Sequence, residues 1–361
     1  MSDRIMPAMI AAYAGVLLVL LLLVPYVTVQ YRRRGALGPG RVVLAVSTLV
    51  YAVALLAYVL LPLPPVGPDF CQVHGVDPQL RPFQFVADIV HEGASSPTAL
   101  IRNPAVLGVA FNIMLFVPFG ALFRHLTGQS IATTAVAGAA VSMLVELTQV
   151  TGVWSLFPCA YRLFDVDDLI TNTTGAFIGA MVVAPVLRGL PGQKIQGPPE
   201  APRPLTTGRR LLGMLCDFLA VMLTGGAAHA LAQFIDIGGG VMQVADAVAW
   251  LLPALGQLAL IWWTGATLGE HSIRVRPTDS TTDLKPRAKL TRWGAGIGGY
   301  NLLIIPEVGI TSVLASALAV ANVAAAAFTR RHRGLAYAAA GLDLTDAREM
   351  QPAEGIPKER T

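Results

Sequence analysis

The sequence predicts an all-α, polytopic membrane protein with eight or nine transmembrane helices. Hydrophobic residues make up 54% of its 361 residues and charged residues only 13%, whereas soluble proteins carry roughly a quarter charged residues. Apolar runs of about 20 residues, the length that crosses a bilayer as a helix, recur along the chain. Lysine and arginine gather in alternate connecting segments, which is typical of cytoplasmic loops. The net charge of +4 therefore indicates topology, and we expect no nucleic-acid partner.

The apolar runs define the expected spans in order. Five are long enough to cross a bilayer outright, and they cover residues 7–29, 42–61, 104–123, 131–150 and 211–231. Two more, 169–187 and 244–263, are nearly as apolar. The last run, 294–328, is too long for one helix and is interrupted at "IIPEVG". It predicts a hairpin, built either from two short spans or from one re-entrant piece and one span.

The distribution of basic residues predicts the topology. "YRRRG" at 31–35 places the end of the first span inside, so the N-terminus is expected outside and the C-terminus in the cytoplasm. With this alternation, 22 of the 26 lysines and arginines fall on the inside and only four on the outside. The asymmetry supports a multi-pass protein with one defined orientation.

A proline-rich segment divides the chain. Residues 191–208, which include "QKIQGPPEAPRPLTT", have the composition of a linker. They predict a five-span unit over 1–190 and a second membrane unit over 209–341. We expect residues 342–361 to form a polar cytoplasmic tail.

Two of the three cysteines are expected outside. Cys71 and Cys159 fall in the outer loops that flank the third and fourth spans, whereas Cys216 lies within a span. An oxidising compartment favours a disulfide between the first two. Because sequence gives no distance between them, a disulfide and two free thiols are equally open.

Polar side chains within the spans predict a pocket in the outer half of the membrane. Such groups are costly in hydrocarbon, and they mark functional sites when they cluster. They lie on one face of each of three spans, the third with Asn112, the fourth with Ser142, Glu146 and Gln149, and the fifth with Asp168 and Asn172. At about 1.5 Å of rise per residue, all of them lie nearer the outer ends of their helices.

The loop between the fourth and fifth spans opens on the same side and brings further charge to the pocket, with Arg162, Asp165, Asp167 and Asp168. Structural roles are the alternative to ligand binding for several of these residues. Asn112 is typical of an interhelical hydrogen bond, one of the aspartates is expected to cap a helix, and Arg162 could form an interfacial ion pair with Asp165. Glu146 resists such an interpretation, because a carboxylate in a span needs a partner, for which Arg162 and Gln149 are the candidates.

Three sequence blocks resemble those of the VanZ-like family. They are "FNIMLFVPFGALF" at 111–123, "VSMLVELTQVTG" at 141–152 and "RLFDVDDLITNTTGAFIG" at 162–179. The matching positions include Asn112, Glu146, Gln149, Arg162, Asp165, Asp167, Asp168 and Asn172. The resemblance implies a bacterial plasma-membrane protein that lowers susceptibility to the glycopeptide teicoplanin. It implies a phenotype and no particular reaction.

The second unit resembles the RDD family. "GRRLLGMLCDFLAV" carries Arg210 at the start of a span and Asp217 seven residues later, and "TGATLGEHSIRVRP" and "RRHRGLAYAAAG" resemble later segments. The chain departs from that family at Ala336 and Tyr337, where an aspartate is usual. The resemblance implies a transport role. For Asp217 itself, an ion or transport site and a structural hydrogen bond to neighbouring helices are equally open.

Three hypotheses follow. In the first, which we favour, the pocket binds a membrane lipid headgroup or a lipid-linked cell-wall precursor without catalysis. In the second, the loop aspartates and Glu146 hold a divalent cation and act on a lipid phosphate. Their spacing fits no metal motif, so we expect no metal and no other cofactor. In the third, the protein is a transporter centred on Asp217 and Glu307. The sequence does not define an oligomeric state.

Overall fold

The computed structural model describes residues 2–60, 66–74, 77–93, 96–160, 162–190, 197–234, 240–278, 284–305 and 309–349. In this part of the chain, eight helices are long and apolar enough to cross a membrane. They cover Gly15–Arg34, Pro39–Tyr58, Pro104–Thr127, Ile131–Val150, Val166–Leu187, Thr207–Gln233, Ala247–Thr264 and Gly309–Phe328. The chain is thus a mostly helical, multi-pass membrane protein, in agreement with the predicted fold class.

The chain forms two compact units, and the first helix contributes to both. Unit 1 contains Met1–Leu17 and Gly38–Lys194, and unit 2 contains Leu18–Leu37 and Ile195–Thr361. The sequence-based boundary near residue 190 assigned the whole first span to unit 1. The structure differs because the second half of α1 (Ser2–Arg34) packs in unit 2, where Val27 and Tyr31 are buried and Thr28 hydrogen-bonds Ser272 at 2.9 Å.

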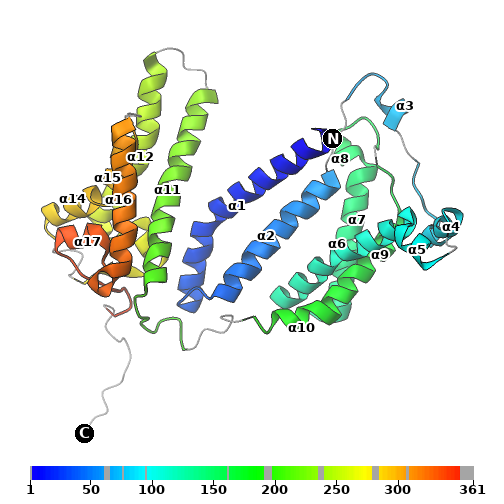
Figure 1. Cartoon of the computed structure of the whole chain (residues 1–361), viewed down its shortest axis with the longest axis horizontal. Helices are drawn as coiled ribbons and strands as arrows, with labels where there is room; N and C mark the ends of the chain where they lie inside the picture. The colour runs from blue at the N-terminus through cyan, green and yellow to red at the C-terminus, as the bar shows by residue number, and fades with distance from the viewer. Residues whose placement is uncertain are drawn as a thin grey trace, which may run out of the picture. The chain divides into compact units, whose positions relative to one another are not determined.

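The described part of unit 1 carries four membrane-length segments besides its part of α1, and Figure 1 labels its helices. Its elements are α2 (Pro39–Leu60), α3 (Phe70–His74), α4 (Gln84–His91), α5 (Pro97–Arg102), α6 (Pro104–Thr127), α7 (Ile131–Val150), α8 (Gly152–Ser155), α9 (Val166–Ile178), η1 (Gly179–Val183) and α10 (Ala184–Leu187). Side-chain caps define where three of the helices begin, because Asn103, Ser130 and Asp165 accept hydrogen bonds from the first backbone amides of α6, α7 and α9.

Helices α6 and α9 pack with their backbones in contact. A Cβ atom at Gly175 would overlap the backbone of Ile113, and one at Gly179 would overlap that of Val117. This is the close approach that glycines at helical spacing permit between membrane helices. The α9 segment continues as a π-helix over η1, where the carbonyl of Ala180 accepts a hydrogen bond from Arg124 at 2.6 Å.

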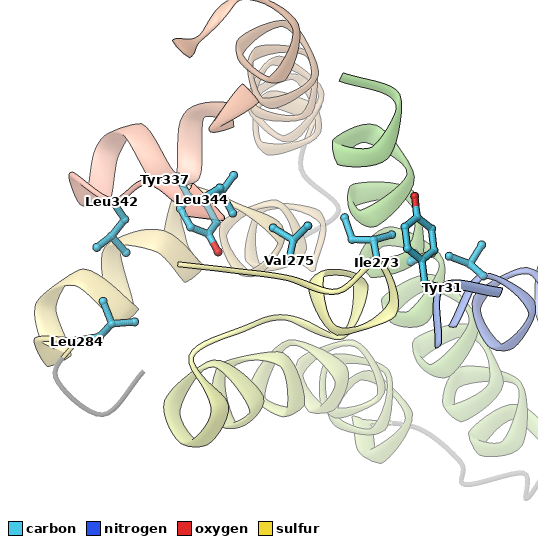
Figure 2. Close-up of a cluster of buried hydrophobic side chains, with 9 residues drawn as sticks. Tyr31, Ile273, Val275, Leu284, Tyr337, Leu342 and Leu344 are labelled. Carbon is cyan, nitrogen blue, oxygen red and sulfur yellow. The ribbon is translucent and has the colours of Figure 1, made fainter. Parts of the chain in front are cut away.

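Unit 2 combines membrane helices with a small sheet. Its elements after α1 are α11 (Thr207–Phe234), α12 (Gly240–Thr264), α13 (Leu268–Ser272), β1 (Val275–Pro277), α14 (Pro286–Gly294), α15 (Ile297–Ile304), α16 (Gly309–Phe328), η2 (Arg330–His332), α17 (Gly334–Ala340) and β2 (Leu344–Asp346). Strands β1 and β2 pair antiparallel, with Val275 opposite Asp346. Figure 2 shows the buried cluster around them, which includes Tyr31, Ile273, Tyr337 and Leu344.

The end of the chain differs from the sequence-based expectation. Residues 342–349 were expected in a polar tail, but Leu342 and Leu344 are buried in the hydrophobic cluster of unit 2, and β2 belongs to its sheet. Within the described residues of the run 294–328, one helix, α16, has membrane length, and the eight-residue α15 is too short to cross a bilayer. Glu307 and residues 350–361 lie outside the described residues.

Candidate functional site

Unit 1 contains a pocket of about 220 Å³ that is lined largely by polar side chains. Six of the nine predicted residues line it, namely Asn112, Glu146, Gln149, Arg162, Asp168 and Asn172. Its remaining walls come from Leu55, Tyr58, Leu115, Phe116, Val145 and Leu163. We call this the unit 1 pocket. Its residues come from α2, α6, α7 and α9 and from the loop before α9, so four membrane segments define one site.

Glu146 is tied to the loop that precedes α9. Its side chain is 2% exposed, and Oε2 accepts a hydrogen bond from the backbone N–H of Asp165 at 3.0 Å. The partner is therefore a backbone amide, where the sequence suggested Arg162 or Gln149. The contact fixes the loop against α7 and leaves Oε1 of Glu146 without a hydrogen bond from the described residues.

Two amide side chains connect the helices around the pocket. Asn112 on α6 donates to Oδ1 of Asp168 on α9, and Asn172 on α9 donates to the hydroxyl of Ser142 on α7 at 2.9 Å. The oxygen of the Asn172 side chain is buried without a partner. Ser142 does not line the pocket, and it contacts a pocket residue through the hydrogen bond from Asn172.

Asp165 and Asp167 were predicted pocket residues, but their carboxylates form hydrogen bonds outside the pocket. Asp165 caps α9 by accepting from the Asp167 N–H at 2.8 Å, and Gln79 donates to the same carboxylate. Burial, with the nearby Asp167 carboxylate, raises the pKa of Asp165 above its ordinary value. Asp167 accepts from the backbone amides of Phe83 and Phe85. The two carboxylates therefore hold the segment around residues 79–85 against the start of α9.

Tyr58 is a pocket residue that the sequence did not single out. Arg162 donates to the backbone carbonyl of Tyr58 at 3.0 Å, and its guanidinium lies 6.0 Å from the centre of the tyrosine ring, within the range of a cation–π interaction. The ring also packs on Phe111 with centroids 5.1 Å apart. The available signal was an aromatic residue at the end of a span, a common anchor at membrane interfaces.

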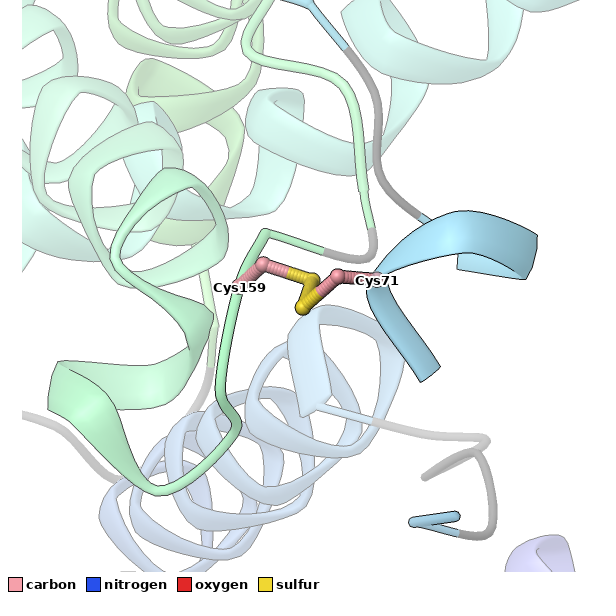
Figure 3. The surroundings of a disulfide bond; sticks show 2 residues. All are labelled: Cys71 and Cys159. Atoms are coloured by element: carbon pink, nitrogen blue, oxygen red, sulfur yellow. A yellow bond between two sulfur atoms is a disulfide. The ribbon is translucent and has the colours of Figure 1, made fainter. Parts of the chain in front are cut away.

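A disulfide closes the loops next to the pocket. Cys71 and Cys159 are bonded, with Cα atoms 5.8 Å apart (Figure 3), and the rings of Phe70 and Phe157 stack beside them with centroids 5.6 Å apart. The bond joins α3 to the loop that carries Arg162. The sequence left this pairing open against two free thiols.

The predicted polar residues of unit 2 lie in a separate cluster. Arg210 pairs with Glu270 at 3.1 Å, and Arg292 lies 3.4 Å from the same carboxylate. Burial alone would raise the pKa of Glu270, but the Arg292 and Arg210 guanidiniums hold that pKa below its usual value. Asp217 accepts from Gln257, Thr267 and the Gly269 amide, which are hydrogen bonds to neighbouring segments. Among the described residues, no group of three or more His, Cys, Asp or Glu is arranged to hold a metal ion.

Comparison with known proteins identifies part of the chain. Residues 48–188 match the model of the VanZ/LLP1 family, a range that includes every residue lining the unit 1 pocket. No curated protein and no solved structure matches the chain. The N-terminal unit is therefore VanZ-like. The match does not extend into unit 2, for which the likeness to the RDD family stays a prediction.

Proposed function

We propose that the unit 1 pocket binds the polar headgroup of a membrane lipid or of a lipid-linked cell-wall precursor, in the outer leaflet of the bacterial plasma membrane. Through this binding the protein lowers the susceptibility of the cell to teicoplanin-type glycopeptides, the property that resemblance to the VanZ-like family implies. The proposal contains no catalysed step. The ligand chemistry follows from the pocket itself.

The supporting observation is that three acceptor oxygens in the pocket have no hydrogen-bond donor in the described part of the chain. Oε1 of Glu146, Oδ2 of Asp168 and the buried Oδ1 of Asn172 accept no hydrogen bond from the described residues. All three are acceptors, and two belong to carboxylates, so they favour a ligand that presents hydroxyl or ammonium donors. A sugar, a glycerol or an amine headgroup has these groups.

Arg162 adds a complementary charge at the same pocket. A guanidinium is suited to a phosphate, to which it can donate two parallel hydrogen bonds. Lipid headgroups and lipid-linked precursors combine a phosphate with hydroxyl or amine groups. The pocket therefore has acceptors for one part of such a headgroup and a cation for the other.

Glycopeptide susceptibility tests the proposal. Wild-type protein, Glu146→Gln and Asp168→Asn are expressed in a susceptible bacterium. Each substitution keeps the side-chain size but removes the charge that holds the donor. We expect both variants to return teicoplanin susceptibility to that of cells without the protein, at equal membrane expression. Asp69→Asn, an exposed carboxylate of the same unit that does not line the pocket, is the control. Full protection by both pocket variants would refute the proposal.

A further inference from the structure

Unit 2 contains a second polar pocket, of about 460 Å³, whose lining is dominated by positive charge. The basic residues are Arg32 at the end of α1, Arg274 and Arg276 around β1, and Arg348 after β2, with His271 of α13 beside them. Glu270, Val275 and Ala347 complete the lining. We call this the basic pocket. It shares no residue with the unit 1 pocket.

Three of its arginines have guanidiniums without a partner in the described residues. Arg32, Arg274 and Arg276 make no side-chain hydrogen bond or ion pair within the described residues. Burial is the main cause that lowers the pKa of His271, and the charges of Arg276 and Arg32 lower it further. The donors of these arginines are therefore available to a ligand.

Two carboxylates in the described residues near the pocket are already neutralised. Glu270 lies between Arg210 and Arg292, and Asp346 is paired with Arg209 at 2.9 Å and with Arg348 at 2.6 Å. Neither is free to balance the three uncommitted arginines. The pocket thus holds an excess of positive charge that would attract an anion.

The backbone that carries these arginines is held in place. Arg209 donates from Nε and Nη2 to the carbonyl of Ile273, at 3.1 and 2.7 Å, and from Nη2 to that of Arg274 at 3.0 Å. Arg274 itself has a left-handed backbone, with φ of 54°, which is uncommon for a residue with a side chain. The Thr28–Ser272 hydrogen bond fixes the end of α1 beside α13. The backbone that carries these arginines is therefore in place before any ligand arrives.

The position of the pocket suits a ligand at the membrane surface. Arg32 lies in the last turn of one membrane helix, and His271 to Arg276 follow shortly after another ends at Thr264. A topology signal needs only the number of basic residues on one side. It does not need their convergence on one cavity, where like charges repel. Basic pockets at the ends of membrane helices are suited to phosphate-containing headgroups.

We propose that the basic pocket binds a phosphate group, carried either by an anionic lipid headgroup or by a soluble phosphorylated compound. Arginine forks match phosphate oxygens in geometry and charge, and three of them converge here. The site is independent of the unit 1 pocket and of the proposed glycopeptide function, so either proposal can fail alone.

The test uses the full chain in phosphatidylcholine nanodiscs. Inorganic pyrophosphate is the soluble probe, measured by titration, and phosphatidylglycerol added to the discs is the lipid probe, measured by native mass spectrometry. We expect Arg274→Gln and Arg276→Gln each to weaken binding of the effective probe by about tenfold or more, which corresponds to about 1.4 kcal/mol. Arg287→Gln, an exposed arginine of the same unit outside the pocket, should bind like the wild type.

The outcomes separate the two sources of phosphate. Retention of phosphatidylglycerol without pyrophosphate binding identifies a lipid headgroup, whereas saturable pyrophosphate binding that displaces the lipid identifies a soluble compound. Wild-type protein that binds neither probe overturns the proposal, as does equal binding by the pocket variants and Arg287→Gln. If Arg274→Gln and Arg276→Gln lose their fold, Arg32→Gln, in the exposed last turn of α1, is compared with Arg287→Gln in the same way.

Discussion

The buried carboxylate of Asp346 offers a quantitative test of how the end of the chain is held against the rest of unit 2. Asp346 is 1% exposed. It accepts hydrogen bonds from Arg348 and from the Arg203 backbone amide, and it pairs with Arg209. Replacing it with asparagine removes the charge and leaves two buried guanidiniums without their counter-charge. Arg209 also donates a hydrogen bond to the carbonyl of Ile273, in the turn before β1. The change should therefore destabilise the end of the chain and that turn together.

The size of the effect follows from the pKa of Asp346. Burial alone would raise it, but the hydrogen bonds from Arg348 and the charge of Arg209 lower it from 3.8 to about 2. At 1.36 kcal/mol per pKa unit, the charged form contributes about 2 kcal/mol to the free energy of unfolding. Removing one member of a buried pair costs about 3–5 kcal/mol, so we expect Asp346→Asn to cost about 2–4 kcal/mol. Because the folded-state pKa is depressed, this stabilisation is present above a pH of about 4 and is lost as the pH falls towards about 2.

Hydrogen exchange at residues 344–349 measures this loss locally. A cost of about 2–4 kcal/mol predicts exchange that is about 30-fold to 1000-fold faster in Asp346→Asn than in wild type. Asp343→Asn is the matched control, because Asp343 is half-exposed and its pairs with Arg331 and Arg333 lie at the surface, where ion pairs contribute less than about 1 kcal/mol. Equal exchange in the two variants, or the same acid-induced loss of stability in Asp346→Asn as in wild type, would refute the reasoning.

Three further results are expected. Gly175→Ala should lower the free energy of unfolding by about 1–3 kcal/mol, because its Cβ would meet the backbone of Ile113. Gly108→Ala, whose Cβ would have nothing within 4 Å, should change the thermal midpoint little. Equal midpoints in the two variants would contradict the close packing of α6 on α9. Cys159 should react with a membrane-impermeant maleimide in intact cells only in Cys71→Ser or after reduction, and labelling of the unreduced wild type would exclude the disulfide. The cysteine of Lys285→Cys should stay unlabelled in intact cells and react after lysis, and its labelling from outside would invert the predicted topology.

Much of the fold could be predicted from sequence because its determinants are local. Run length and hydropathy located the spans, and helical spacing placed Glu146 and Asn172 on faces that the structure brings together. These inferences need only the geometry of a single helix.

The remainder depends on which segments become neighbours. Asp167 is turned towards the amides of Phe83 and Phe85, more than 80 residues away in sequence, and no pattern indicated that contact. Tyr58 enters the pocket because α2 lies beside α6 and α7, which periodicity does not specify. Val27 lies within an apolar run like any other, so its burial in unit 2 could not be read from composition.

The ligand bound to the unit 1 pocket tests the central claim most directly. Wild-type protein and the double variant Glu146→Gln/Asp168→Asn are purified from bacterial membranes and analysed by native mass spectrometry with lipid extraction. We predict that the wild type retains a lipid or lipid-linked precursor with hydroxyl or amine groups on its headgroup, and that the double variant has lost it. The same lipids on both proteins, or a wild type that retains none, would contradict the claim.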